Sequence, residues 1–547
     1  MVGIRLDIEK IFLLLFFGVF LFAGYGFFSA GRLQHGFPYG YLASDAFQHQ
    51  IRAESIKDAG NYKNEASYIV MGVQGAVGYY PPVLYHLSVI LSHLSGLEVY
   101  DTIYFIVFFF AAIASLMMYM TIRQFNKNVA IISLPICLLV FSGGLYTGFT
   151  WGNWPTLLSQ FFLVCVFWCT SRLDLKKSYI LLGIFLSANV MTHTSEGLFA
   201  GVYLALFFLA SCIVAKKIRL GALKSLVLGG VLAFAITSYY LVIFKGVWVP
   251  RQPFVFAVSR MWDNPTMYLS DFKLFAAFMI IGIVLSLFFI KKSLVPALSS
   301  LSMILIGMGN YYGFREKAFQ LRFFWPIFLS FLIGFGIYQS LKLVIKDWKL
   351  LYSVILSSVV AFAILLGSVP LVPHYSKLET NGLMDQYHWE AFKWLEKNSE
   401  QESRVYFFHG DIYSQDALLR NAKRTHAQII PEDFVDAIKK REIRRIYETD
   451  MPGDGGGGAP YRKSFFSFGF ALDENRPENS PGKKDICNFD YYVFDKLSRQ
   501  QVLAQYNLVI ASELQKKSFI GKPFENQVVL ILKNNRRGDD CIEQRNF

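Results

Sequence analysis

Long apolar runs, separated by short polar segments, fill the first two thirds of the chain. A run of about 20 apolar residues is long enough to cross a bilayer as a helix. From about residue 373 onward the apolar runs become short and the polar fraction rises. We therefore expect an α-helical polytopic membrane domain over residues 1–372 and a small soluble domain over residues 373–547. The eleven expected spans lie near residues 11–30, 102–122, 129–147, 155–171, 178–192, 196–215, 222–244, 272–290, 293–309, 323–341 and 350–370.

One further apolar segment, Pro82–Leu97, differs from these runs because it is short and starts after Pro81. At 100° per residue its polar side chains share one half of a helix, and its leucines lie mostly on the other half. That pattern is typical of a helix lying flat in the membrane interface rather than of a span. The polar set is His86, Ser88, Ser92, His93 and Ser95, and the apolar set is Leu84, Leu87, Leu91 and Leu94.

The distribution of basic residues supports this interpretation and assigns the two sides of the membrane. If Pro82–Leu97 does not span, five basic clusters lie on the side of the N-terminus, and the facing loops at 143–154 and 192–196 contain no Lys or Arg. Cytoplasmic loops are enriched in Lys and Arg, so we expect a cytoplasmic N-terminus, a first outer loop over residues 31–101 and an extracytoplasmic C-terminal domain. The clusters are Arg123/Lys127, Arg172/Lys176/Lys177, Lys216/Lys217/Arg219, Lys291/Lys292 and Lys342/Lys346/Lys349.

The composition is typical of a membrane protein, and it gives the net positive charge an explanation other than nucleic-acid binding. The chain is 54% hydrophobic and 17% charged, whereas soluble domains carry about 25% charged residues. The formal charge of +13 is found mostly between apolar runs, where basic residues orient helices, so we expect a lipid bilayer and no nucleic acid as partner.

The C-terminal segment predicts an α/β domain. Residues 388–397 have the pattern of an amphipathic helix, and short β-rich runs occur at 404–408, 508–510 and 528–532. Cys487 and Cys541 are the two cysteines of this segment. Outside the cytoplasm such a pair favours a disulfide.

The first outer loop contains an acid followed by a histidine one turn later. Ser44 is a candidate N-cap, which places Asp45 in the first turn of a helix and His49 on the same face. This pair suits general-base chemistry or metal ligation at the membrane surface. The alternative is that Asp45 only complements the helix dipole, which is worth about 0.3–1 kcal/mol.

Two other outer loops contain candidate substrate-binding residues. Trp151 and Trp154 suit either an interfacial aromatic belt or a platform on which a sugar stacks. His193 and Glu196 lie at the outer membrane boundary, where ionisable groups are costly and therefore functional candidates, unless they only close a tight turn.

Two arginines run against the usual distribution of charge. Arg315 and Arg322 precede a span on the outer side, where basic residues are uncommon. Guanidinium groups bind phosphate in a bidentate manner, so these residues suit a lipid phosphate. The alternative is non-specific binding of ordinary lipid headgroups.

The order of these features resembles the C-type glycosyltransferase superfamily, whose members use polyprenyl-phosphate-linked sugars, and in particular its archaeal and bacterial members without a settled substrate. The resemblance covers roughly residues 1–370. It rests on Ser44-Asp45-Ala46-Phe47-Gln48-His49, Tyr79-Tyr80-Pro81-Pro82-Val83-Leu84-Tyr85-His86, Thr192-His193-Thr194-Ser195-Glu196-Gly197 and Arg322-Phe323-Phe324-Trp325-Pro326.

Two departures argue against a typical oligosaccharyltransferase. The C-terminal segment has no Trp-Trp-Asp-Tyr-Gly signature, and Phe47 stands where an Asp-x-Asp motif would place a second acid. Both favour transfer of a single sugar, by a hexosyl- or pentosyltransferase, over transfer of a whole glycan.

The resemblance implies roles for the candidate residues. Asp45 is the expected general base, His49 orients it or shares a metal with it, and Arg315 and Arg322 stabilise the phosphate. The expected substrate-binding set is His86, Trp151, Trp154, His193, Glu196, Arg315 and Arg322.

The expected partners are a polyprenyl-phosphate-linked sugar and a glycan, lipid or protein acceptor in the cell envelope. A divalent cation, Mg or Mn, is a candidate cofactor if four side chains converge. They are Asp45, His49, His193 and Glu196. Two alternative functions remain: a transporter or flippase of lipid-linked sugars, and a non-catalytic membrane scaffold.

Overall fold

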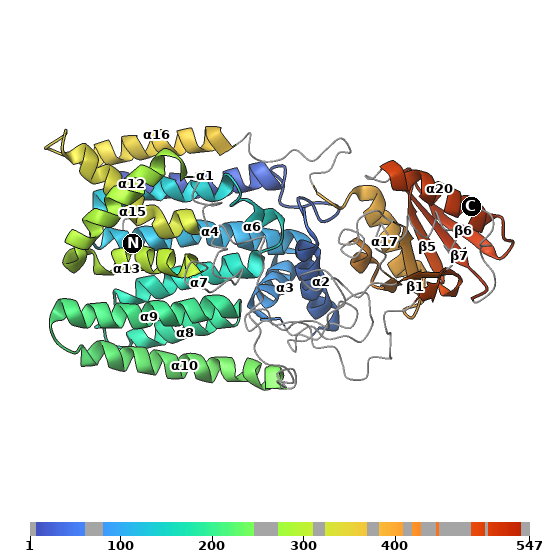
Figure 1. Ribbon diagram of the computed structural model, residues 1–547, viewed down its shortest axis with the longest axis horizontal. Coiled ribbons are helices and arrows are strands. Elements are labelled where there is room, and N and C mark those ends of the chain that lie inside the picture. The colour runs from blue at the N-terminus through green and yellow to red at the C-terminus, as the bar shows by residue number, and fades with distance from the viewer. Residues whose placement is uncertain are drawn as a thin grey trace, which may run out of the picture.

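A helical bundle and a smaller α/β region lie at opposite ends of the long axis of the computed structural model (Figure 1). The structure describes residues 7–60, 80–245, 272–309, 323–368, 382–408, 418–427, 445–447, 483–497 and 501–537. The expected domain boundary near residue 372 and the candidate residues Arg315, Arg322 and Cys541 lie outside these ranges.

Helices occupy each of the apolar runs that the sequence marks as a span. Six of the described helices are long and apolar enough to cross a membrane, by length and composition. These findings confirm an α-helical polytopic architecture, while eleven as the number of spans stays a prediction. The helices are α1 Ile8–Phe28, α4 Val99–Arg123, α5 Lys127–Ser133 continued by the 3₁₀ helix η1 Leu134–Phe141, α7 Trp154–Thr170, α8 Ser178–Val190, α9 Thr194–Ala215, α10 Leu220–Lys245, α12 Leu274–Phe288, α13 Ile290–Gly307, α15 Trp325–Lys342 and α16 Leu350–Ser368.

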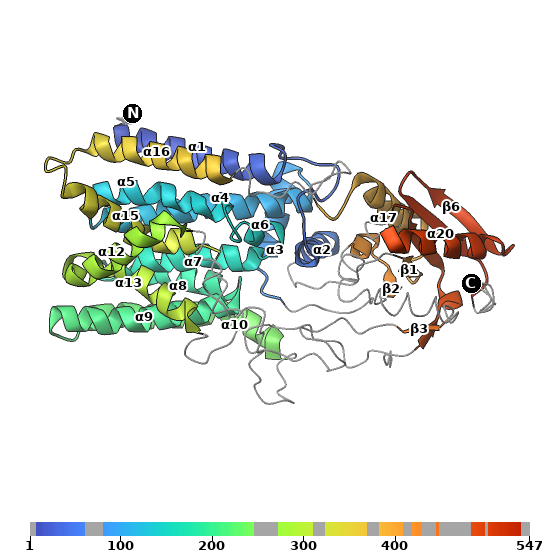
Figure 2. The same cartoon turned by 45° about the horizontal axis from the view of Figure 1, so that its top comes forward.

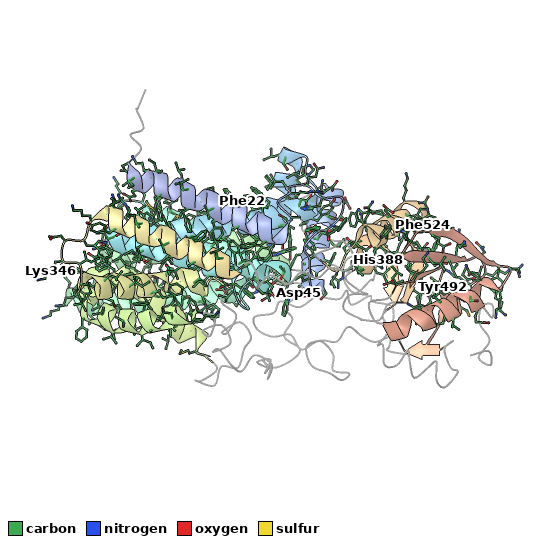
Figure 3. All side chains as sticks on the ribbon, turned by 90° about the horizontal axis from the view of Figure 1, so that it is seen from above. Phe22, Asp45, Lys346, His388, Tyr492 and Phe524 are labelled. Atoms are coloured by element: carbon green, nitrogen blue, oxygen red, sulfur yellow. The ribbon has the colours of Figure 1, made fainter. Side chains whose placement is uncertain are left out.

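The interior of the bundle is closely packed, while its outer surface is apolar. Helix α15 is buried along most of its length, and a Cβ at its Gly336 would collide with the carbonyl oxygen of Phe278 in α12. Glycine at such a contact lets two helix backbones approach closely. Phe22 of α1 is 79% exposed on the outside of the bundle (Figure 3), which suits contact with lipid chains.

The two ends of the bundle differ. The N-terminus and Lys346 lie at the end away from the α/β region (Figures 1 and 3). Near that same end Glu9, in the first turn of α1, forms salt bridges with Arg123 and Lys127. The grouping of basic residues with the N-terminus therefore agrees with the structure, and which end faces the cytoplasm stays a prediction.

Two helices between α1 and α4 lie at the opposite end, next to the α/β region. Helix α2 (Ser44–Ala59) crosses the end of the bundle, roughly perpendicular to the long helices (Figures 1 and 2). Helix α3 (Val83–Ser95) packs against α2 and α4, and Gly96, with φ 74°, ends it before α4 begins.

The amphipathic pattern of α3 appears only in part in its contacts. Ser92 Oγ accepts a hydrogen bond from Lys57 Nζ of α2 at 3.0 Å, and the carbonyl of Ser88 accepts one from Thr102 Oγ1 of α4 at 3.0 Å. On the other face Leu94 is 81% exposed. Ser92 and the main chain of Ser88 therefore face α2 and α4, but His93 and Ser95 are exposed and Leu84 is buried, so the polar and apolar halves divide only in part as the sequence predicts. The interfacial position of α3 stays a prediction.

The C-terminal region is a small α/β domain, as the sequence indicates. Its five-stranded sheet has the order β2-β1-β5-β7-β6, in which β1 pairs in parallel with β2 and β5, and β7 pairs antiparallel with β5 and β6. The elements are α17 Gln386–Asn398, β1 Arg404–Phe408, the 3₁₀ helix η6 Arg420–Ala422, β2 Thr425–Ala427, β5 Tyr491–Asp495, α20 Gln501–Gln515, β6 Ile520–Glu525 and β7 Val529–Asn534, with β3 Arg445–Tyr447 and β4 Lys483–Asp485 as a separate antiparallel pair.

One strand expectation is wrong. Residues 508–510 lie within helix α20, not in a strand. Ile510, Ala511 and Leu514 are buried there, while Leu508 and Val509 are exposed. This spacing has the period of a helix, which overrides the β propensity of the short apolar run.

The domain is held against the end of the bundle that carries α2. The Leu383 N–H donates to the carbonyl of Tyr41 at 2.7 Å, and the ring of Trp389 in α17 lies 5.5 Å from that of Tyr100 at the start of α4. The start of the C-terminal domain therefore packs against this end of the bundle.

Candidate active site

Asp45 lies in the first turn of α2, between the bundle and the α/β domain (Figure 3). Its side chain is exposed, in contrast to most of the helix that follows it. The N-cap is Ala43 rather than the expected Ser44, and no side chain caps the helix. Asp45 therefore keeps its carboxylate at the positive end of a helix, on an accessible surface.

The segment that precedes α7 touches this turn. The Leu42 N–H donates to the carbonyl of Thr150 at 2.8 Å. Gly152 has φ 85° and sits so close to the backbone of Asp45 and Ala46 that a Cβ there would collide with both. A side chain at this position is excluded by space and by backbone conformation. The loop that carries Trp151, which is 39% exposed, is thus held beside Asp45.

His49 lies one turn further along α2 and is buried. Its Nδ1 is 2.8 Å from the hydroxyl of Tyr85, and its ring centroid is 5.2 Å from that of Tyr80. Burial, followed by the positive charges of Arg52, His193 and Arg420, holds the pKa of His49 well below its usual value. His49 is therefore a neutral imidazole at physiological pH.

His193 and Glu196 separate into two environments. His193 is the N-cap of α9; its Nδ1 is 2.7 Å from Ser195 Oγ, and its ring is 6.4 Å from that of Tyr80, so it joins the cluster around His49. Glu196 is fully buried, and its Oε1 accepts from Gln160 Nε2 at 3.4 Å. Since Gln160 also accepts from the N–H of Phe324 at 2.9 Å, Glu196 belongs to a junction of α7, α9 and α15.

Trp154 is a packing residue. It is fully buried, its Nε1 donates to the carbonyl of Phe149 at 2.6 Å, and its ring packs against Tyr41 and His49 at 4.9 and 6.3 Å. Neither the membrane belt nor the sugar platform describes a ring with no exposed face. Trp151 keeps the substrate-binding role as a prediction. His86, half-buried on α3, likewise remains a prediction.

The four candidate metal ligands do not form a metal site. Among the described residues no group of three or more His, Cys, Asp or Glu side chains is arranged to hold a metal ion. Asp45 is exposed, His49 contacts Tyr85, and Glu196 contacts Gln160. These residues do not fit a divalent cation as arranged, and the function proposed below does not depend on one.

One of the two cysteines of the expected disulfide lies in the described residues. Cys487 is buried and disulfide-bonded. Its expected partner Cys541 lies outside the described residues, so the pairing stays a prediction. Cys137, Cys165, Cys169 and Cys212 are free, as expected for cysteines in apolar helices.

The structure adds residues to which the sequence assigns no role. Tyr80 and Tyr85 lie in a segment quoted for the resemblance, and their contacts with His49 required the fold. Arg52 lies one turn after His49 with only 2% of its surface exposed, and its guanidinium carbon is 5.6 Å from the ring of Tyr80. Arg420 comes from the C-terminal domain, where no sequence pattern marks it.

The fold matches solved structures over nearly the whole chain. ArnT from Cupriavidus metallidurans in its apo state matches with a TM-score of 0.58 and 12% identity, over 98% of this chain and 100% of that one. The chain therefore shares the fold of ArnT. The same protein bound to undecaprenyl phosphate matches with a TM-score of 0.54 and 12% identity, over 98% and 99% of the two chains.

An archaeal enzyme gives a less complete match. The oligosaccharyltransferase AglB from Archaeoglobus fulgidus, in complex with an inhibitory peptide and a dolichol-phosphate, matches with a TM-score of 0.50 and 12% identity. The match covers 76% of this chain and 64% of that one, so this chain spans less than two thirds of AglB. No family model and no curated protein matches the sequence.

Proposed function

We propose that this chain is a membrane glycosyltransferase that moves a sugar from a polyprenyl-phosphate carrier to an acceptor on the extracytoplasmic face. The match to ArnT, which also has a structure with undecaprenyl phosphate bound, supports a lipid-linked donor. The dolichol-phosphate in the AglB complex supports the same class of carrier. The acceptor is a glycan, lipid or protein.

Transfer of a single sugar fits better than transfer of a whole glycan. The match to ArnT covers both chains almost completely, whereas 36% of AglB has no counterpart in this chain. The absence of a Trp-Trp-Asp-Tyr-Gly sequence points the same way.

Asp45 acts as the general base in this proposal. Its carboxylate accepts the proton of an acceptor hydroxyl as that oxygen attacks the anomeric carbon of the sugar. The bond between the anomeric carbon and the phosphate oxygen breaks, and its electron pair leaves with the polyprenyl phosphate. The products are the glycosylated acceptor, the free lipid phosphate and a protonated Asp45.

The exposure of Asp45 on α2, within a fold matched over its full length, is the observation that carries the proposal. A base must reach the proton it removes, and Asp45 meets this condition without any rearrangement of the helix. Because His49 is neutral, it adds no positive charge that would oppose transfer of the acceptor's proton to Asp45.

Arg315 and Arg322 stabilise the charge on the departing phosphate in this proposal, on the sequence argument alone. Replacing Arg322 by Ala is expected to raise the KM for the donor lipid more than the KM for the acceptor. An equal change in both would indicate a structural role.

The deciding experiment compares Asp45→Asn with the wild type in a transfer assay with purified protein and a lipid-linked sugar identified by mass spectrometry of co-purified lipid. We expect a loss of about 10²–10⁴-fold in kcat, with unchanged folding. Glu98→Gln is the matched control, because Glu98 is an exposed carboxylate at the start of α4 whose side chain caps no backbone N–H. Full activity of Asp45→Asn would disprove the general-base assignment.

The same experiment separates the alternatives. A flippase would translocate the lipid-linked sugar, tolerate Asp45→Asn and show no transfer. A scaffold would do neither.

A further inference from the structure

A polar residue of α7 holds the start of α15. Gln160 is fully buried, and its Oε1 accepts a hydrogen bond from the backbone N–H of Phe324 at 2.9 Å. Phe324 is the N-cap of α15, and its own side chain has no acceptor to offer the helix. A backbone N–H without an acceptor is costly in an apolar interior. Helix α7 therefore satisfies a group at the start of α15 that would otherwise be expensive to bury.

The orientation of the Gln160 amide follows from this contact. Because the N–H of Phe324 only donates, the amide oxygen must face it, and the amide nitrogen makes the second contact. Nε2 lies 3.4 Å from Oε1 of Glu196, which is fully buried in the first turn of α9. This distance is long for a hydrogen bond, but the group facing the amide nitrogen must be an acceptor. Gln160 thus joins the start of α9 to the start of α15.

The residue before Gln160 anchors the turn between α8 and α9. Ser159 Oγ donates to the carbonyl of Asn189 at 2.9 Å, and Asn189 Nδ2 donates to the carbonyl of Ser159 at 2.7 Å. Both side chains are fully buried. The carbonyl of Asn189 also accepts from the N–H of His193 at 3.0 Å. Two consecutive residues of α7 therefore hold both the turn that carries His193 and the start of α15.

The start of α15 also packs against the segment that contacts the turn of Asp45. A Cβ at Gly148, in the short helix α6 (Thr147–Thr150), would lie 2.6 Å from Cγ of Phe323. Four residues later, Gly152 packs on the backbone of Asp45. Because both contacts are close-packed, α6 sets the distance between the turn of Asp45 and the start of α15.

We propose that Gln160, with Glu196 as its partner, is a positioning residue that fixes the start of α15 relative to the turn of Asp45. This inference rests on the proposed glycosyltransferase function, in which Arg322, two residues before Phe324 in the sequence, serves the lipid phosphate. Gln160 is buried at the junction of three helices, so it acts through α15 and not on the substrate. A misplacement of about 1 Å in an active site can cost about 10²-fold in rate.

The first measurement compares Gln160→Met with the wild type in the transfer assay on the full-length protein. Methionine keeps the length of the side chain but replaces the amide by a weak acceptor, so the N–H of Phe324 loses its hydrogen bond. We expect the KM for the lipid-linked donor to rise about tenfold and the KM for the acceptor to change less. Hydrogen exchange at the start of α15 should become faster, which reports on the junction without turnover.

Ser300→Ala is the matched control. Ser300 of α13 is fully buried, and its Oγ donates to the carbonyl of Phe328 in α15 at 2.6 Å. The variant removes a contact with the same helix one turn after its start, so it is expected to lower stability and leave the donor KM unchanged. Equal rises of the donor KM in Gln160→Met and Ser300→Ala would overturn the proposal, because they would indicate a general loosening of α15. An unchanged donor KM in Gln160→Met would overturn it as well.

An exchange of the two polar groups tests the partner. Gln160→Glu keeps an acceptor for the N–H of Phe324 but places a second carboxyl group beside Glu196, which is expected to raise the donor KM and lower stability. The double variant Gln160→Glu/Glu196→Gln restores a donor and an acceptor at this contact and should recover most of the donor affinity. A double variant no better than Gln160→Glu would overturn the proposal, because it would indicate that the carboxylate of Glu196 is needed for the substrate. If Gln160→Glu does not fold, the comparison of Gln160→Met with Ser300→Ala decides.

The proposed function can fail separately from this inference. If the wild type transfers no sugar, the glycosyltransferase proposal fails, and hydrogen exchange then decides the role of Gln160. Faster exchange at the start of α15 in Gln160→Met than in Ser300→Ala supports the positioning role, and equal exchange overturns it.

Discussion

Two helices of this protein carry an aspartate at their start and a histidine about one turn later, yet the two Asp–His pairs differ in burial and in contacts. On α2 the pair is Asp45 and His49, and on α17 it is Asp385 and His388. In sequence they differ by one residue of spacing. In the fold Asp45 is exposed and His49 contacts Tyr85. Asp385 and His388, in contrast, are buried and contact each other.

The pair on α17 is closed because Asp385 is the N-cap. Its Oδ1 accepts from the backbone N–H of His388 at 2.8 Å, and its Oδ2 lies 2.7 Å from His388 Nδ1. Asp495 of β5 approaches the other ring nitrogen at 3.6 Å. Burial by itself lowers the pKa of His388, but the two carboxylates outweigh it and raise the pKa to about 9.

On α2 the residue at the N-cap is Ala43 rather than an acid, and no side chain caps the helix. Asp45 is exposed, and His49 contacts Tyr85 instead. Burial and the neighbouring positive charges of Arg52, His193 and Arg420 lower the pKa of His49. The difference shows that the position of the aspartate at the helix start and the charged neighbours from other elements, not the Asp–His spacing, decide whether a histidine is charged.

The strongest test of this comparison replaces each of the two aspartates by asparagine, in two separate variants. Asp385→Asn keeps a capping side chain but removes a carboxylate from a buried ion pair, which is expected to cost roughly 3–5 kcal/mol. Hydrogen exchange of α17 and β5 in the full-length protein measures this loss. Asp45→Asn is expected to leave the same exchange rates unchanged and to remove transfer activity. Matching effects of the two substitutions would contradict the division between a structural and a catalytic pair.

The second prediction concerns alkaline pH. The folded pKa of His388 is above the value of about 6.5 expected in the unfolded chain, so its contribution to stability is fully present below pH 6.5 and is lost as pH rises through about 9. The contribution is on the order of 3 kcal/mol. Urea unfolding of the C-terminal domain at pH 6.5 and pH 10 measures it. The variant His388→Gln should show a smaller difference between these two pH values, and an unchanged difference would contradict the prediction.

Much of the fold could be predicted because a helix that crosses a membrane must be both apolar and long enough to span it. The apolar runs became helices, and the amphipathic segments at Val83–Ser95 and Gln386–Asn398 did as well. The helix containing residues 508–510 was missed because a three-residue apolar run does not show its period. Its helical spacing is visible only when Ile510, Ala511 and Leu514 are considered together.

The candidate site was predicted less completely, because its contacts join distant segments. The Asp45 turn and the His193 turn were found from local patterns, since ionisable residues stand out beside apolar helices. The burial of Trp154 and the contact of Glu196 with Gln160 depend on how α7 and α9 pack. Arg420 lies 371 residues from His49 in the sequence, and only the docking of η6 on α2 relates them.

The third prediction concerns acidic pH and the other histidine. Because the folded pKa of His49 lies below its unfolded value, the unfolded chain takes up a proton that the folded chain does not, and stability falls as pH drops below about 6.5. His49→Gln is expected to weaken this acid sensitivity while losing the contact with Tyr85, at a cost of about 1 kcal/mol at pH 7. Thermal unfolding at pH 5 and pH 7 measures both effects. A larger acid sensitivity in His49→Gln than in the wild type would show that His49 is charged in the folded state.

The smallest expected effect comes from giving α2 the cap that α17 already has. Ala43 has φ −143° and ψ 163°, the extended conformation of an N-cap residue, but it offers no side-chain acceptor. Ala43→Ser supplies one for the N–H groups of the first turn and is expected to stabilise the protein by about 0.5–1 kcal/mol, measured by thermal unfolding. Transfer activity should not change, because the new hydroxyl does not compete for Asp45. Ala43→Val is the control, since it adds volume without an acceptor. If both variants destabilise the protein, the loop at Gly152, which packs on the backbone of Asp45 and Ala46, already fills the space a cap requires. The exposed position of Asp45 would then be caused by that loop rather than by the missing cap.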